Sequence, residues 1–534
     1  VAQAKTTPLL LVVGLLLSTS TRGLMAPYKM DSATAEKNLK LIESLGEPQK
    51  MWAAFARLSA VPRPSGKEEA IRAHVRAVAE QRSLAVTEDA VGNMLVKVPG
   101  NAKAKPVLIQ GHLDMVTEKN SDVDHDFDEQ GIELSVENGF LTSAKKTTLG
   151  ADNGIGVATA LALLEDADYE SRPPLELLFT IDEERGLVGA RFLDAETLGI
   201  TARTLLNLDT EEWESIYCGC SGGGDSVFSF PVVASSEESP AGAATYRLRL
   251  TGCTGGHSGV DIDKGRCNAV EALAGLVKSL LSSSSDVSLV EICGGDKRNA
   301  IPREAEAILR TTMANFEEAV QAYFDAEIKA KVEKTDPFVA LAVTTEDNGY
   351  RSKPSLQNAD ALINLLAKDG LTRGVVKFSE AIPGLVETSS NLASAKPLDE
   401  SRYEIVCSTR SSVSTELERI RDGLAASVKA AGGSVTLRSE AYKGWNPNMK
   451  SPVLNLTKQK YAQLTGGDPH IKAIHAGLEC GLLIAKVSDD LDCVSFGPTI
   501  FDAHTPDERL QIDTVKPFYD LVKQVLLALA AQAS

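Results

Sequence analysis

Histidine and acidic side chains of the kind that bind metal ions follow apolar stretches at five places in this chain. The segments that carry them are Gly111–Val116, Leu149–Gly154, Asp182–Gly186, Asn207–Glu212 and Ala503–Glu508. In an open α/β sheet, ligands bind beyond the carboxyl ends of the strands. Several ligand-type segments that each follow a strand therefore predict a metal site at that edge of a sheet.

The chemistry that these residue types could perform is hydrolysis assisted by a pair of metal ions. Two divalent ions about 3.5–4 Å apart need a bridging carboxylate among nitrogen and oxygen ligands. Histidine and carboxylate ligands favour zinc, with cobalt or manganese as alternatives. The pair Glu183 and Glu184 offers one ligand and one general base for the water between the ions. His112 and Asp114 would project from the same face of a strand, so Asp114 could orient the imidazole.

Each of these residues, taken alone, has an ordinary structural explanation. Asp152, Asn153 and Gly154 form a common turn sequence, and adjacent acidic residues usually face solvent. A histidine two positions before an aspartate also occurs on many surface strands. The prediction rests on the order of the five segments and on their shared position after strands.

The elements that must position these residues alternate between strands and helices. Apolar runs and helical spacing of apolar residues predict both kinds of element. Strands are expected at 107–109, 175–180 and 204–208, and helices at 44–57, 67–81 and 154–164, with residues 61–66 as the linker between the first two helices. This alternation favours an α/β layer fold with a largely parallel sheet.

A second kind of pattern interrupts the first. The chain is rich in glycine at 221–225 and rich in Ser, Glu, Pro and Ala at 234–244, which marks a domain boundary. Strands and helices of an α+β domain follow, and the first pattern returns after Tyr442. We predict a mixed, largely parallel α/β domain interrupted by an inserted α+β domain. The predicted divisions are a segment at 1–34, the first domain at 35–224 and 441–534, and the inserted domain at 225–440.

Composition places the chain among globular proteins of two or three domains. It has 534 residues, of which 43% are hydrophobic and 24% charged. A formal net charge of -18 argues against nucleic acid or a membrane surface as a partner. The eight cysteines include no C-x-x-C pair and are too sparse in a chain of this length for a disulfide scaffold, a pattern that suits a cytoplasmic location.

The N-terminal residues raise an alternative location. Leu9 to Leu17 is an apolar run that follows Lys5. Its length is that of a signal-peptide core and is too short to span a bilayer. We expect residues 1–34 to be a targeting segment or to be absent from the mature protein. A true targeting signal would make the location secretory or organellar instead of cytoplasmic.

Several motifs, taken together, resemble those of the aminoacyl-histidine (Xaa-His) dipeptidases. This family belongs to a wider clan of di-zinc metallopeptidases that includes aminoacylase and carboxypeptidase G. The motifs lie at 111–122, 147–156, 255–259, 298–304, 386–391 and 475–482. The matches run in order from about residue 40 to the end of the chain. The resemblance implies two divalent metal ions per subunit, a dipeptide substrate of the Xaa-His or carnosine type or broader, and a homodimer that forms through an inserted lid domain.

The resemblance also implies a role for each candidate residue of the metal site. The implied ligands are His112 and Asp209 for one ion, Glu184 and His504 for the other, and Asp152 as the bridge. Glu183 matches the general base, which would take a proton from the attacking water and pass it to the leaving amine. Asp114 matches the catalytic residue beside His112. The bond between Asp152 and Asn153 matches a position where the clan often has a cis peptide.

Three residues of the inserted domain match positions that act on the substrate. His257 matches a histidine that stabilises the oxyanion. Asn268 and Arg410 match positions that contact the substrate, and an arginine fork suits a dipeptide carboxylate. The region around Glu479 is expected to line the pocket.

Two other functions remain open at this point. One keeps the metal site and changes the bond, as in an amidohydrolase that acts on N-acyl amino acids. The other is a catalytically inactive binding protein with the same fold. The intact Glu183 and the five intact ligands favour the enzyme.

Overall fold

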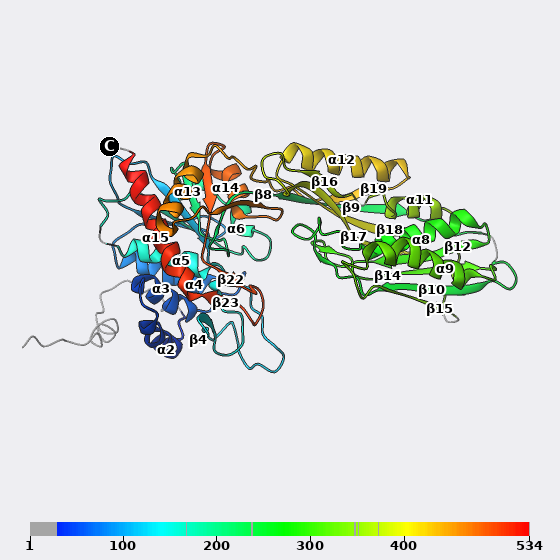
Figure 1. Ribbon diagram of the computed structural model, residues 1–534, viewed down its shortest axis with the longest axis horizontal. Coiled ribbons are helices and arrows are strands. Elements are labelled where there is room, and N and C mark those ends of the chain that lie inside the picture. The colour runs from blue at the N-terminus through cyan, green and yellow to red at the C-terminus, as the bar shows by residue number, and fades with distance from the viewer. Residues whose placement is uncertain are drawn as a thin grey trace, which may run out of the picture.

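The chain folds into two bodies, each with its own β-sheet (Figure 1). The computed structural model describes residues 29–166, 168–236, 239–346, 349–350, 352–371 and 373–532. The first body combines the N-terminal and C-terminal parts of the chain, and the second consists of the middle part. The predicted fold class, a mixed α/β domain interrupted by an inserted α+β domain, is confirmed.

The sheet of the first body has eight strands and is mixed. Its order is β1 (Val86–Glu88), β2 (Met94–Val98), β6 (Leu175–Thr180), β3 (Val107–His112), β7 (Thr204–Asn207), β21 (Asp492–Ser495), β8 (Ser215–Cys220) and β20 (His470–Ile474). The central strands β6, β3, β7 and β21 are parallel to one another. Strands β3 and β6 are buried along their whole length, as expected for parallel strands with both faces covered.

Helices surround this sheet, and a small antiparallel sheet lies beside it. The helices are α2 (Ser32–Ile42), α3 (Gln49–Ser59), α4 (Glu69–Glu80), α5 (Ala151–Leu164), α6 (Val188–Arg191), α7 (Ala195–Leu198), α13 (Pro452–Thr465), α14 (Glu479–Val487) and α15 (Ile512–Ala531), with a 3-10 turn at Glu43–Leu45. The small sheet has the order β22 (Ile500–Phe501), β23 (Arg509–Gln511), β5 (Phe140–Ser143) and β4 (Leu134–Glu137). Helix α5 packs against both α3 and β3, which fixes the start of α5 beside the end of that strand.

The second body contains a nine-stranded antiparallel sheet. Its order is β15 (Ala340–Thr345), β10 (Ala244–Thr251), β14 (Ala305–Thr311), β12 (Val287–Gly294), β17 (Val386–Asp399), β18 (Arg402–Ser411), β9 (Gly222–Pro231) and β19 (Ser434–Arg438), with β16 (Gly374–Phe378) paired to β17. A short ribbon pairs β11 (Gly256–His257) with β13 (Ala300–Ile301). The helices are α8 (Ala269–Ser283), α9 (Phe316–Tyr323), α10 (Ala330–Val332), α11 (Ala359–Leu366) and α12 (Ser414–Ala430), with a π-helical turn at Phe324–Lys329.

Each body has a separate apolar core. One core contains buried residues between Ile42 and Cys220 and between Trp445 and Leu526. The other contains buried residues between Phe228 and Val428. This separation supports the division predicted at residues 224/225 and 440/441, although the boundaries themselves stay a prediction.

Two details differ from the sequence expectation. The helix expected from Ser44 begins instead at Gln49, because Pro48 cannot continue a preceding helix. The N-terminal segment was expected to end at residue 34, yet α2 already begins at Ser32. The apolar run from Leu9 to Leu17 lies outside the described residues. Among the residues described, no helix has the length and apolarity needed to cross a membrane.

Candidate metal centre

The ends of four adjacent parallel strands bring the predicted ligands together. His112 is the last residue of β3, and Asp209 follows β7 by two residues. Glu184 lies in the loop after β6, and His504 lies in the segment that follows β21. Asp152 stands at the start of α5. The carboxyl edge of the sheet therefore collects the five side chains, as the position of the segments after strands predicted.

The five side chains form two groups of three that share one carboxylate. His112 Nε2 lies 3.0 Å from Asp152 Oδ1 and 3.3 Å from Asp209 Oδ1. On the other side, His504 Nε2 lies 3.1 Å from Asp152 Oδ2 and 2.9 Å from Glu184 Oε2. In each group the candidate ligand atoms lie within 4.8 Å of one another. Each oxygen of Asp152 thus faces a different group, which is the arrangement that a bridging carboxylate needs.

The chemistry of this cluster fits two divalent cations. Asp152, Glu184 and Asp209 place three carboxylates in one partly buried space, where uncompensated negative charge is costly. Oε1 of Glu184 is buried and has no hydrogen-bond partner among the described residues. Hydrogen bonds to Asp152 and Glu184 raise the pKa of His504 to about 11, so the carboxylates attract positive charge strongly. Cations at the two groups would satisfy these carboxylates.

Asp114 connects the first ligand to the acidic pair. Its Oδ1 accepts the backbone N–H of Glu183 at 3.0 Å, and its Oδ2 accepts that of Glu184 at 3.2 Å. The hydroxyl of Ser65 donates to Oδ2 at 2.8 Å. Nδ1 of His112 lies 3.4 Å from Oδ1. One buried carboxylate therefore fixes the backbone of Glu183 and Glu184 and faces the ring of His112.

Glu183 stands beside the ligand groups with a perturbed carboxyl. Burial raises its pKa well above the ordinary value, and the carboxylates of Asp209 and Glu479 raise it further, against the lowering effect of His112. A carboxylate in this environment accepts a proton readily, which is the property of a general base. The peptide bond between Asp152 and Asn153 is cis, as the resemblance implied.

The predicted residues of the inserted domain form a second cluster. Arg410 Nη2 lies 3.4 Å from His257 Nε2, and its Nη1 lies 3.3 Å from the hydroxyl of Tyr442. Among the described residues, no hydrogen bond or ion pair joins this cluster to the metal ligands. The structure thus brings His257 and Arg410 together without placing either in contact with the candidate metal groups.

Asn268 has a local structural role. Its Oδ1 accepts the N–H groups of Val270 and Glu271 and so caps α8. Its Nδ2 donates to the carbonyl of Leu392 at 2.8 Å. Both ends of the side-chain amide are therefore engaged within the second body. The predicted contact between Asn268 and the substrate stays a prediction.

Comparison with known proteins identifies the family. Residues 108–528 match the model of peptidase family M20/M25/M40. The chain belongs to this family. It is therefore a peptidase, and its membership agrees with the predicted relationship to aminoacyl-histidine dipeptidases. Members of the family use divalent metal ions, which the two ligand groups fit.

Two relatives cover most of the chain. The cytosol non-specific dipeptidase of Escherichia coli (strain K12) is 36% identical over 496 residues, which cover 91% of this chain and 98% of that protein. The aminoacylhistidine dipeptidase of Vibrio alginolyticus has a TM-score of 0.80 and 34% identity, and the match covers 90% of this chain and 96% of that one. The aminopeptidase PepT of Bacillus cereus, with a TM-score of 0.51 and 16% identity over 91% of this chain and 100% of that one, shows the fold alone.

Sequence patterns missed a buried polar layer beneath the candidate metal ligands. Gln110 Nε2 donates to Thr180 Oγ1 at 3.1 Å and also to Glu479. The amide of Asn207 donates to Gln110 Oε1 at 2.6 Å, and Asn207 Oδ1 accepts the backbone N–H of Asp209 at 3.3 Å. The side chain of Glu479 is fully buried in this layer. The expectation that the region around Glu479 lines the pocket stays a prediction. Single polar residues inside apolar strands were the available sign of the layer.

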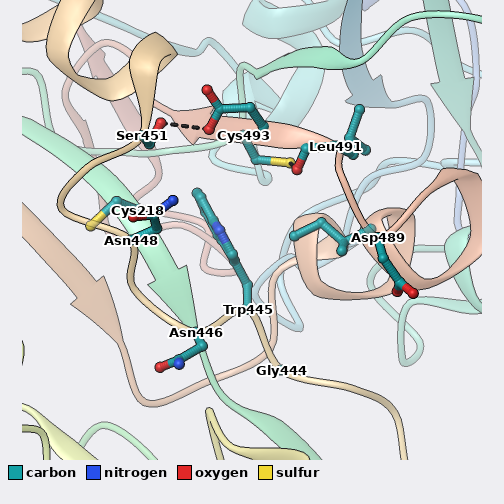
Figure 2. A pocket seen from close by; sticks show the side chains of 11 residues that line it. Cys218, Gly444, Trp445, Asn446, Asn448, Ser451, Asp489, Leu491 and Cys493 are labelled. Carbon is teal, nitrogen blue, oxygen red and sulfur yellow. Dashed lines mark hydrogen bonds between the residues drawn. The ribbon is translucent and has the colours of Figure 1, made fainter.

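A separate cavity of about 220 Å³ lies away from the ligand groups. It is lined by Cys218 of β8 and by residues that follow the insertion, among them Trp445, Ser451 and Cys493, and it shares no residue with the ligand set (Figure 2). The hydroxyl of Ser451 donates to Asp492 at 2.5 Å on its wall. The cavity therefore has no part in the site described here.

Proposed function

We propose that this M20 peptidase hydrolyses dipeptides with two divalent metal ions, of which zinc is the best fit. The observation that carries the proposal is the division of the ligands into two groups that share Asp152. In this proposal, His112 and Asp209 bind one ion and Glu184 and His504 bind the other. The mixture of imidazole and carboxylate ligands favours zinc, with cobalt and manganese as alternatives.

The chain's own residues would carry the proton and hold the reacting groups. Ions bound here would lower the pKa of a water and polarise the scissile carbonyl. Glu183 takes a proton from the attacking water and delivers it to the leaving amine, and its raised pKa supports this role. Asp114 keeps the backbone of Glu183 and the ring of His112 in place through Oδ1, and the backbone of Glu184 through Oδ2.

His257 and Arg410 act on the substrate in this proposal. Nδ1 of His257 lies 3.1 Å from the N–H of Gly259 and 3.2 Å from that of Val260, so the ring proton resides on Nε2. Burial and the nearby charge of Arg410 lower the pKa of His257 to about 4. The neutral ring therefore presents an Nε2–H donor that suits an oxyanion. The guanidinium of Arg410 suits the substrate carboxylate.

A closing motion is part of the proposal. The catalytic domain would be residues 35–224 with 441–534, and the lid would be residues 225–440. Because His257 and Arg410 have no contact with the ligand groups in the described structure, rotation of the lid toward the sheet edge is needed to bring them to the substrate. Closure of this kind would also exclude water from the reaction.

The similar proteins support a dipeptide as the substrate. One is named a non-specific dipeptidase and the other an aminoacylhistidine dipeptidase. We infer a dipeptide with a free carboxylate, either of the Xaa-His type or of broader composition. Rates on a dipeptide panel and on N-acetyl amino acids would separate this function from that of a deacylase. Faster hydrolysis of the N-acetyl compounds would contradict the proposal.

The decisive experiment combines metal analysis with two variants of the adjacent acidic pair. Glu183→Gln is expected to retain both ions and to lose hydrolysis by about 10²–10⁴-fold, the usual contribution of a general base. Glu184→Gln is expected to lose one ion as well as activity. A fully metallated wild-type protein that cleaves no dipeptide would refute the proposed function.

We also propose that the protein is a cytoplasmic homodimer that associates through the lid. The edge strand β19 exposes Val435 and Leu437, with 43% and 48% of their surface accessible, and an exposed strand edge can pair with another chain. Analytical ultracentrifugation of the full chain tests the dimer. A monomer at micromolar concentration would contradict it.

A further inference from the structure

The stretch at 61–66 connects α3 to α4, as expected of a linker, and it also packs under the candidate metal centre. Arg63 is 2% exposed. Its Nη1 donates to the carbonyls of Leu113 and Asp114 at 3.0 and 2.9 Å, and its Nη2 donates to the carbonyl of Gly150. A side chain at position 150 would collide with Nη2. One buried guanidinium therefore joins the segment after His112 to the segment before Asp152.

Glu508 holds the same segment from its other side. This residue is 3% exposed, and its carboxylate accepts four consecutive backbone N–H groups. The donors are Leu149 at 2.8 Å and Gly150 at 3.0 Å to Oε2, and Ala151 at 2.8 Å and Asp152 at 3.3 Å to Oε1. Four backbone donors converging on one carboxylate define the position of this loop more closely than a single bond could.

We propose that Glu508 and Arg63 are positioning residues that set the location of Asp152 between the two metal ions. Glu508 fixes the N–H groups of residues 149–152, and Arg63 fixes the carbonyl of Gly150. Neither side chain is a ligand, and each acts through the backbone that carries the bridging carboxylate. The proposal rests on the proposed function, because it assumes that Asp152 bridges two ions.

The chemistry of an amide side chain makes the proposal testable. In Glu508→Gln one acceptor oxygen becomes an NH₂ group, which then faces two of the four backbone N–H groups. Donors that face donors cannot bond, so the loop must move away. A small displacement at Asp152 affects both ions, because one oxygen faces each ligand group.

A matched control exists at the opposite end of the same sheet. Glu176, at the start of β6, is also 3% exposed, and its carboxylate accepts the N–H groups of Thr201 and Ala202 at 2.9 and 3.0 Å. Glu176→Gln therefore makes the same chemical change in a buried carboxylate that holds backbone. It lies away from the metal ligands, so it reports on general destabilisation.

The test measures the affinity of the full chain for Zn²⁺ by competition with a chelator, without substrate. Glu508→Gln is expected to weaken zinc binding about ten- to hundredfold, the usual effect of removing an outer-layer partner of a metal site. Glu176→Gln is expected to bind zinc like the wild type. The visible spectrum of the cobalt-loaded protein should also change in Glu508→Gln and stay unchanged in the control.

Each outcome bears on the proposal. Wild-type zinc affinity in Glu508→Gln, or an equal loss in both variants, would overturn it and leave the proposed function standing. A wild-type protein that binds no pair of ions would overturn the proposed function itself.

If Glu508→Gln does not fold, Arg63→Lys replaces it, with Arg421→Lys as its control. Arg421 is equally buried and donates to the carbonyls of Asp225 and Ser439 in the second body. Loss of zinc affinity in Arg63→Lys alone supports the proposal, and unchanged affinity overturns it.

Discussion

Replacing Asp114 by asparagine tests how far catalysis depends on the residue that holds the acidic pair. The carboxylate of Asp114 accepts one backbone N–H on each oxygen, from Glu183 and Glu184. In Asp114→Asn one of these N–H groups must face an NH₂ group instead. The hydroxyl of Ser65 can rotate to become an acceptor, so its bond is replaceable.

The magnitude follows from the loss of that one bond. A hydrogen bond to a charged group contributes about 1.5–3 kcal/mol, and about 1.4 kcal/mol corresponds to a tenfold change in rate. We therefore expect kcat to fall about ten- to hundredfold. KM should stay near the wild-type value, because Asp114 is buried and faces Glu183, Glu184 and His112.

The assay measures initial rates on a dipeptide with metal-saturated protein, together with metal content. The control is Asp492→Asn at the start of β21, where the carboxylate accepts the Ser451 hydroxyl and the N–H of Val453. This control is expected to keep the wild-type kcat. An unchanged kcat in Asp114→Asn, or an equal fall in the control, would refute the reasoning.

Three further predictions concern pH, metal and substrate binding. Burial and the charge of Arg57 lower the pKa of His74 to about 4 in the folded chain. As the pH falls below about 6.5, His74 therefore becomes protonated in the unfolded chain while it stays neutral in the folded chain. This difference in protonation should lower the free energy of unfolding by about 2 kcal/mol between pH 7 and pH 5. Denaturant titrations at the two pH values should show that His74→Gln lacks this part of the pH dependence. Removal of the metal by a chelator should abolish activity and lower the Tm. Adding Zn²⁺ at about 100 times its Kd should then restore about 2.7 kcal/mol of stability. A Tm that does not change when the chelator is added would contradict bound metal. Arg410→Lys should raise KM about tenfold with a smaller effect on kcat, because a bidentate contact with the substrate carboxylate is lost; steady-state kinetics showing an unchanged KM would exclude that contact.

The sequence predicted the sheet edge because buried parallel strands have a clear pattern. Strands β3, β6 and β7 are short apolar runs, and the candidate ligands lie at or within a few residues of their ends. The change from apolar strand residues to polar ligand-type residues is therefore enough to locate the carboxyl edge of the sheet in the sequence. The pairing of His112 with Asp209 was implied by the family resemblance instead, and the structure places the two side chains 3.3 Å apart at the ends of the adjacent strands β3 and β7.

Strand β17 escaped prediction because its buried residues are polar. Residues 386–395 are buried on both faces, although they include Thr388, Ser389 and Ser390. Their hydroxyl groups bond to Ser411, His475 and Thr409 on neighbouring segments. A strand whose polar groups find partners far along the chain shows neither an apolar run nor an alternating pattern.

The contacts that fix the position of Asp152 could not be predicted from the sequence, for a related reason. Glu508 lies 356 residues after Asp152 in the chain, and Arg63 comes from a stretch that reads as a linker. The inserted domain separates the two ends of the catalytic unit, so no local pattern relates them. Because the carboxylate proposed as the bridge is held by residues from both sides of the insertion, the candidate metal site can assemble when both ends have folded onto one sheet. Changes near either end of the chain should therefore affect metal affinity before they affect the lid.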